Sequence, residues 1–175
     1  MNGGYYLDLP FSEGTIKYLS QDGAEKKMLF SYNRFIRERR LIEKNRPSLL
    51  RTFGVNNGLS DVEISTRLMH ALRGDILSAR DKKVLRDYLM NMELEGIVDV
   101  ALSERLSGKE VDRDREIIKD LFFEKLSFEE AMEKYGLSII TIKRIKRKGI
   151  EAVREEIQFR LRMQSSLVPE LMCVP

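Results

Sequence analysis

Apolar residues recur at every third or fourth position along most of this chain, which is the spacing of an amphipathic helix. One such stripe over residues 27–45 predicts a helix that ends before Pro47. Ser60 and Glu63 form a capping-box pattern in front of a second stripe, and Gly74 closes that helix. Helical periodicity therefore dominates the first half of the sequence.

Residues 1–27 lack this spacing. Two short apolar and β-branched runs, at residues 5–9 and 15–19, flank Pro10 and Gly14. Alternating segments around turn residues are typical of a small hairpin or an extended arm. We therefore expect a non-helical N-terminal segment.

The remaining pattern predicts several further helices. Ser78 can open the next helix, and Gly96 precedes a short apolar run. A polar linker is expected at residues 107–112. The later helices are expected at about 113–124, 128–135 and 139–161, with Gly149 as a candidate break in the last one. The sequence thus predicts an all-α protein, divided into an N-terminal segment (1–27), a helical domain (28–106), a helix-turn-helix domain (107–164) and a loose tail (165–175).

The segment from Leu126 to Arg154 carries the most specific local pattern. Ser127 can cap a helix whose inward stripe comprises Phe128, Ala131, Met132 and Tyr135. Gly136 then stands where the chain must leave that helix, a position that often requires positive φ. This pattern predicts a short helix and a tight turn.

Ser138 is the expected N-cap of the following helix, and Ile142 and Ile145 form its inward face. Five cations lie on the same helix: Lys143, Arg144, Lys146, Arg147 and Lys148. Charge runs usually indicate only a solvated helix face, but two helices around a tight turn form the frame of a helix-turn-helix. In that motif the second helix enters the major groove with its first turns nearest the bases. The frame and the charge together favour contact with DNA phosphates.

The stretch from Val111 to Glu155 resembles region four of the bacterial sigma factor family. The resemblance begins at VDRDREIIKDLFFEKLSFEEA, continues through YGLS and ends in IKRIKRKGIEAVRE. It covers about a quarter of the chain, and many transcription regulators contain the same module. The resemblance implies DNA binding and suggests a small regulator of the kind found in phages and mobile elements.

Carried over residue by residue, the resemblance implies that Ser138 caps the recognition helix and that Lys143, Arg144 and Lys148 face DNA. The family often has Arg-Glu after the cap, whereas this chain has Ile139 and Ile140. Two isoleucines can contact a thymine methyl but cannot supply a bidentate hydrogen bond to a base. The full set of expected DNA-binding residues is Ser138, Ile139, Ile140, Thr141, Lys143, Arg144, Arg147 and Lys148.

Composition narrows the class of protein further. The chain has 175 residues, a formal net charge of +3 and one cysteine, Cys173. No apolar run approaches the length of a membrane span, and the first residues lack the order of a signal peptide, so a cytoplasmic protein is expected. A single cysteine excludes an internal disulfide and a cysteine-based zinc site. We expect no metal and no cofactor.

The charge is unevenly distributed. Residues 34–51 and residues 138–162 each carry a net charge of +5, whereas residues 52–137 carry −5. Two basic lobes around an acidic middle suit a protein that binds nucleic acid and also contacts another protein. Such changes of net charge along the sequence are also common in helical proteins. The basic residues 34–51 can therefore equally well form an ordinary solvated surface.

Evidence for catalysis is weak. His70 is the only histidine, and its apolar neighbours favour a partly buried structural residue over a general base. Gly3 and Gly4 lack the lysine and the helix spacing of a phosphate-binding loop. We therefore expect a non-enzymatic protein.

The sequence predicts a DNA-binding transcription regulator that binds double-stranded DNA, with RNA polymerase as a second expected partner. Two alternatives remain open. The chain could be a minimal or alternative sigma factor, or it could be a protein-interaction module whose basic C-terminal lobe binds an acidic partner such as a polymerase subunit or an anti-sigma protein.

Overall fold

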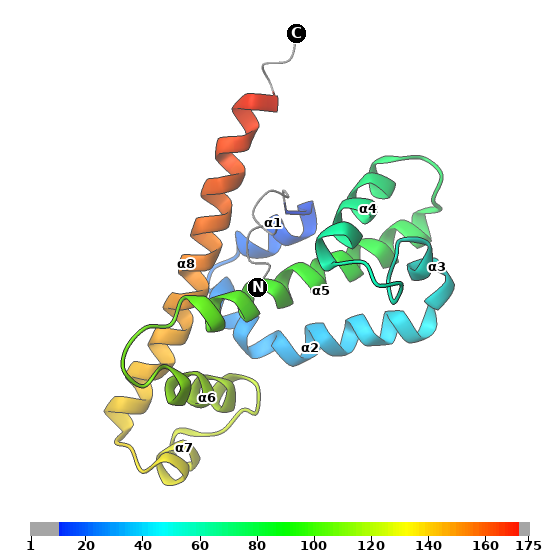
Figure 1. The fold of residues 1–175 in the computed structure, drawn as a ribbon. Coiled ribbons are helices and arrows are strands. Elements are labelled where there is room, and N and C mark those ends of the chain that lie inside the picture. Colours follow the sequence, from blue (N-terminus) through cyan, green and yellow to red (C-terminus); the bar gives the residue numbers. More distant parts are fainter. Residues whose placement is uncertain (1–10, 172–175) are drawn as a thin grey trace.

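A computed structural model describes residues 11–171 of the chain (Figure 1). All regular elements in this described range are α-helices, as the apolar spacing predicts. Their bounds are α1 Glu13–Leu19, α2 Ala24–Asn45, α3 Pro47–Thr52, α4 Asp61–Arg73, α5 Ala79–Glu104, α6 Val111–Phe122, α7 Phe128–Tyr135 and α8 Ile139–Leu171.

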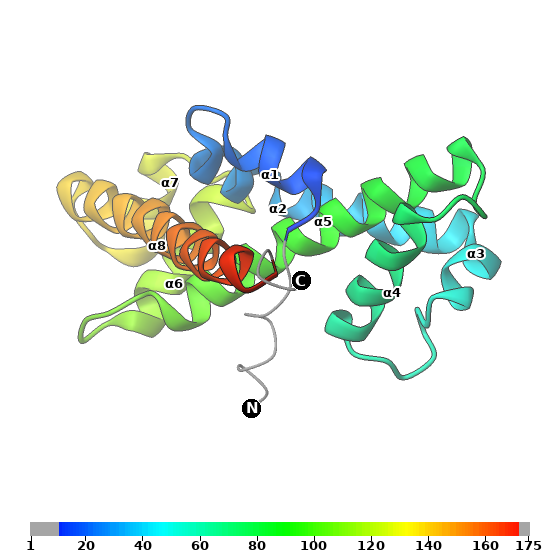
Figure 2. The same ribbon diagram turned by 90° about the horizontal axis from the view of Figure 1, so that it is seen from above.

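Helices α2 and α5 lie side by side and run in opposite directions, and they form the centre of the fold (Figures 1 and 2). Helix α2 ends at Asn45, before Pro47, as predicted. Ser78 caps α5 by accepting a hydrogen bond from the amide of Asp81. Helices α3 and α4 lie toward one end of this pair, and α6, α7 and α8 lie toward the other.

The predicted capping box at the start of α4 is confirmed. Ser60 Oγ accepts a hydrogen bond from the Glu63 amide, and the Glu63 carboxylate accepts one from the Ser60 amide. Each side chain satisfies a backbone donor that the helix leaves free. Gly74 ends the helix, as its position predicted.

Two separate hydrophobic cores form along the α2–α5 pair. The smaller one joins Leu50 of α3 and Leu68 of α4 to Leu85 of α5. The larger one crosses the expected linker and includes residues before and after it, among them Met28, Leu29, Leu94, Ile97, Ile117, Ile118, Phe122, Ala131, Ile142, Ile145 and Val153. The C-terminal helices therefore rest on α2 and α5 in a continuous core.

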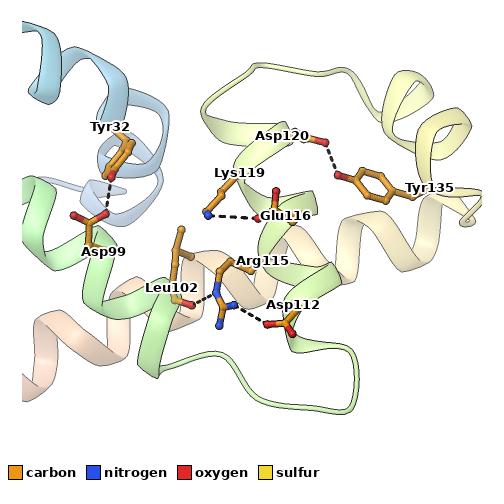
Figure 3. A network of polar contacts seen from close by, with 9 residues as sticks. All are labelled: Tyr32, Asp99, Leu102, Asp112, Arg115, Glu116, Lys119, Asp120 and Tyr135. Carbon is orange, nitrogen blue, oxygen red and sulfur yellow. Dashed lines mark hydrogen bonds and ion pairs between the residues drawn. The ribbon is translucent and has the colours of Figure 1, made fainter. Parts of the chain in front are cut away.

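The segment between α5 and α6 is short, and a side-chain hydrogen bond joins the two helices across it. Arg115 of α6 donates a hydrogen bond from Nε to the Leu102 carbonyl of α5 at 2.8 Å, and its Nη1 lies 2.9 Å from the Asp112 carboxylate (Figure 3). The hydrogen bond between Arg115 and Leu102 bridges the turn that the sequence identified as a linker, whereas Arg115 and Asp112 both belong to α6. The hydrogen bond to Leu102 helps to fix the direction in which α6 leaves α5.

The expected hairpin or arm is wrong for residues 11–27, because residues 13–19 form the helix α1. Ser12 caps this helix by accepting from the Thr15 amide, and the Ser12 amide donates to the carboxylate of Glu93. Phe11 and Thr15 are buried four residues apart, so the segment does contain one helical stripe. The first apolar run of the expected hairpin or arm, residues 5–9, lies outside the described residues.

Helices α5 and α8 both continue through an internal glycine. Gly96 lies within α5, and Gly149, the candidate break, lies buried within α8. Helix α8 also extends to Leu171, where the sequence predicted a loose tail from residue 165. Extending an existing helix fixes one residue for each hydrogen bond gained, so it is easier than starting a new helix. The rest of the expected tail, residues 172–175, lies outside the described part of the chain.

Candidate nucleic-acid interface

Helix α7 begins and ends as the sequence predicts. The Glu130 amide donates to Ser127 Oγ at 3.2 Å, and the Ser127 amide donates to the Glu130 carboxylate at 2.7 Å, which completes a capping box. Gly136 follows α7 with φ 63°, a conformation that glycine adopts without steric cost. The chain thus turns sharply between α7 and α8.

Asp120 of α6 fastens α7 in place. Lys134 Nζ lies 2.7 Å from the Asp120 carboxylate. The Tyr135 hydroxyl donates a hydrogen bond to the same carboxylate oxygen, as Figure 3 shows for Tyr135 and Asp120. Burial alone would raise the pKa of Asp120, but hydrogen bonds from Lys134 and Tyr135 outweigh it and lower the pKa below its ordinary value. The carboxylate therefore stays ionised and holds the last turn of α7 against α6.

The first turns of α8 follow the predicted pattern. Ser138 Oγ accepts a hydrogen bond from the Thr141 amide at 3.3 Å, as an N-cap should. Ile142 and Ile145 are 0% and 1% exposed and lie in the larger core, which confirms the predicted inward face. Because these two residues fix the rotation of α8, the opposite side of the helix must face outward.

That outer side carries most of the expected DNA-binding residues. Lys143, Arg144 and Arg147 are exposed together with the cap Ser138, and Ile139 and Ile140 are 37% and 78% exposed. Within the described residues, the structure gives Arg144 and Arg147 no carboxylate partner, and Lys143 only the ring of Phe128 at 5.6 Å. The first two turns of α8 therefore present positive charge and apolar surface together.

Two of the expected residues differ from this group. Thr141 is half-buried, and its hydroxyl lies 3.0 Å from that of the cap Ser138. Lys148 is also half-buried, and its Nζ lies 2.9 Å from the carboxylate of Asp114, a residue only 4% exposed. This ion pair fastens α8 to α6, so Lys148 has a structural contact that the sequence did not indicate.

Sequence reasoning left Lys146 out of the expected site. Its Nζ lies 4.9 Å from the ring centroid of Phe128, and it also lies over the rings of Phe30 and Phe122. No local pattern could have indicated this, because Phe30 belongs to α2 and is more than a hundred positions away in the sequence.

Other kinds of site find little support in the described part of the chain. It contains no group of three or more His, Cys, Asp or Glu residues arranged to hold a metal ion. His70 is exposed on α4, so the expectation of partial burial is wrong. No helix among the described residues is long and apolar enough to cross a membrane.

Comparison with known proteins agrees with this geometry. Residues 111–155 match the family model for sigma-70, region 4. Neither a search of curated proteins nor a search of solved structures gave a match. The matched residues begin at the first residue of α6 and include the whole of α7 and the first half of α8. The part of this protein that contains α6, α7 and the exposed cations of α8 is a sigma-70 region 4 domain, a helix-turn-helix module of transcription.

Proposed function

We propose that this protein is a transcription regulator that binds duplex DNA through the first turns of α8. The observation that carries the proposal is the exposed set of three cations on the second helix of the helix-turn-helix: Lys143, Arg144 and Arg147. None of the three has a carboxylate partner within the described residues, so their charges are available to an external anion.

Physical chemistry favours a DNA phosphate as that anion. Duplex DNA carries one negative charge per about 1.7 Å of its axis, and cations that neutralise it release bound counterions. Ile139 and Ile140 precede the cations and are exposed at the end of α8 that such a motif inserts into the major groove. Their side chains suit apolar contact with thymine methyl groups, and Arg144 suits a guanine edge.

RNA polymerase is the second partner in this proposal. Residues 52–137 carry a net charge of −5, and helix α4 within this stretch lies toward the end of the α2–α5 pair that is away from α8 (Figure 1). A surface separate from the DNA-binding helix would allow the protein to contact polymerase while it is bound to DNA. The cytoplasm is the setting that fits this role.

A charge-removal variant tests the proposal. Replacing Lys143, Arg144 and Arg147 with glutamine should lower the affinity for random duplex DNA. It should also flatten the dependence of log K on log salt by about 0.9 for each lost phosphate contact. The matched control replaces Arg80, Lys83 and Arg86, three exposed cations of α5, with glutamine.

Fluorescence anisotropy across a salt series provides the measurement, with circular dichroism to verify that both variants are folded. Loss of affinity in the α8 variant alone supports the proposal. Equal affinity of the folded α8 variant and the wild type would contradict it, and would favour the interpretation of the basic lobe as a docking surface for an acidic protein. Promoter opening with core polymerase and no other sigma factor would instead identify the chain as a sigma factor.

A further inference from the structure

Three lysines from different parts of the chain surround one aromatic ring. Their Nζ atoms lie 5.9 Å (Lys26), 4.8 Å (Lys125) and 5.6 Å (Lys146) from the ring centroid of Phe30. Lys26 belongs to α2, Lys125 to the turn before α7, and Lys146 to α8. We call these three residues the lysine patch. Since each lies within 6 Å of the same point, any two Nζ atoms are within about 12 Å of each other.

The charge of the lysine patch is not neutralised from within. None of its three lysines forms an ion pair in the described part of the structure, and Lys125 donates only to the backbone carbonyls of Phe30 and Phe122. Burial lowers the pKa of Lys146, and the positive charge of Lys26 lowers it further. One carboxylate, that of the exposed Glu129, lines the hollow of about 270 Å³ beside the patch. Two patch lysines, Lys125 and Lys146, line this hollow together with that single carboxylate.

The rings that hold these cations are fixed by the core. Phe30 packs edge-on against Phe122, with ring centroids 4.8 Å apart, and Phe122 is completely buried. Phe128, the first residue of α7, packs against the same core. An anion that binds here would meet ammonium groups that are already held close together, which lowers the entropic cost of ordering them.

The lysine patch is continuous with the proposed DNA-binding face. The ring of Phe128 has Lys146 Nζ at 4.9 Å and Lys143 Nζ at 5.6 Å from its centroid, so one aromatic side chain contacts a patch lysine and a cation of the outer face of α8. Helix α2 packs against α8, and the ring of Phe30 on α2 lies beside Lys146 of α8. A duplex seated on the first turns of α8 therefore passes close to α2.

We propose that the lysine patch binds backbone phosphates of the same duplex that α8 contacts, so that the DNA-binding surface extends to α2, outside the sigma-70 region 4 domain. This inference rests on the proposed function, because the duplex must be placed by α8. The patch supplies affinity that does not depend on base sequence, since phosphate contacts position a protein on DNA and carry no sequence information.

The test compares two adjacent lysines of α2. Lys26→Gln removes a charge from the lysine patch, whereas Lys27→Gln removes the same charge from an exposed residue one position away that does not contact Phe30. Lys146→Gln provides a second patch variant on a different helix. Affinity for a random duplex is measured by fluorescence anisotropy across a salt series, with a thermal melt of each variant.

We expect Lys26→Gln and Lys146→Gln each to lower affinity several-fold and to flatten the salt slope by about 0.9, while Lys27→Gln leaves the slope unchanged. If both patch variants fold and their affinity depends on salt as steeply as that of the wild type, the inference is wrong. Suppose that both patch variants behave like the wild type but that replacement of Lys143, Arg144 and Arg147 still lowers the affinity for duplex DNA. The proposed function then stands, and only the inference about the lysine patch is wrong. If the wild type itself does not bind duplex DNA, both fail.

Discussion

Neighbouring cations on α8 have different surroundings and should therefore have different roles. Arg144 is exposed and unpaired within the described residues, whereas Lys148 is half-buried and forms an ion pair with the buried carboxylate of Asp114. Arginine can form two parallel hydrogen bonds with a guanine edge, while lysine acts as a compact point charge. We infer that Arg144 is suited to read a base and that Lys148 supports the helix.

Arg144 and Lys148 should therefore contribute differently to the choice of DNA sequence. Arg144→Ala should relax sequence preference at one base pair, where a good bidentate contact contributes about 1–3 kcal/mol of discrimination. Lys148→Ala should weaken binding to all sequences nearly equally, and it should also lower the melting temperature because Asp114 loses a partner.

Selection from randomised duplexes, carried out with both variants alongside thermal melts, measures these effects. If both variants lost affinity while the preferred sequence stayed the same, α8 would contact only the DNA backbone. A selectivity change in Lys148→Ala alone would reverse the two assignments.

The sequence predicted residues whose role depends on near neighbours. Ser127 and Ser138 each cap a helix by accepting a hydrogen bond from the amide three residues later, and the inward position of Ile142 and Ile145 follows from their spacing. It could not predict the contacts of Lys148, because its partner Asp114 lies on another helix, 34 positions earlier. Side-chain pairs between helices depend on how the helices pack.

At the scale of elements, Gly149 shows why a glycine in a helix is ambiguous in sequence. A Cβ added there would lie 2.9 Å from Cγ2 of Ile118 in α6, which is closer than real contacts allow. The absence of a side chain lets α8 and α6 approach closely, so Gly149 is a packing residue and does not break the helix. A Cβ added at Gly96 in α5 would have no neighbouring atom within 4 Å.

These two glycines provide a matched pair of substitutions. Gly149→Ala should lower the free energy of unfolding by about 1–3 kcal/mol, because the methyl group overpacks against Ile118. Gly96→Ala should raise it by about 0.5–1 kcal/mol, because alanine is the better helix former and meets no neighbour. Urea denaturation measures both, and a stabilising effect of Gly149→Ala would contradict the close α6–α8 contact.

The helix α1 shows a different limit of sequence reasoning. Its seven residues contain β-branched and aromatic side chains that also suit a strand, and Gly14 and Pro10 suggest turns. The helix forms because Ser12 caps it and donates to Glu93 of α5, and because Thr15 is buried. The contact between Ser12 and Glu93 spans 81 positions, so local propensity could not indicate it.

At the scale of the whole molecule, the helix-turn-helix shares its core with the N-terminal helices. Met28 and Leu29 of α2 lie in the same cluster as Ile118 of α6 and Ile145 of α8. The apolar pattern predicted each helix separately, but it could not show that one core crosses the expected linker. Because of this shared core, α2 supports α8 and places Lys26 and Lys146 beside the same ring of Phe30.

The central claim is that the start of α8 lies against the bases of a duplex. Site-directed photocrosslinking tests it most directly, with a benzophenone amino acid placed at Ile140, which is 78% exposed, or at Ile76, which is 99% exposed and lies in the turn between α4 and α5. Both positions tolerate a large side chain because both face solvent. After irradiation with a labelled duplex, we expect a crosslink from position 140 and only background from position 76. Equal yields from the two positions, or none from position 140 while the duplex remains bound, would contradict the proposed DNA-binding mode.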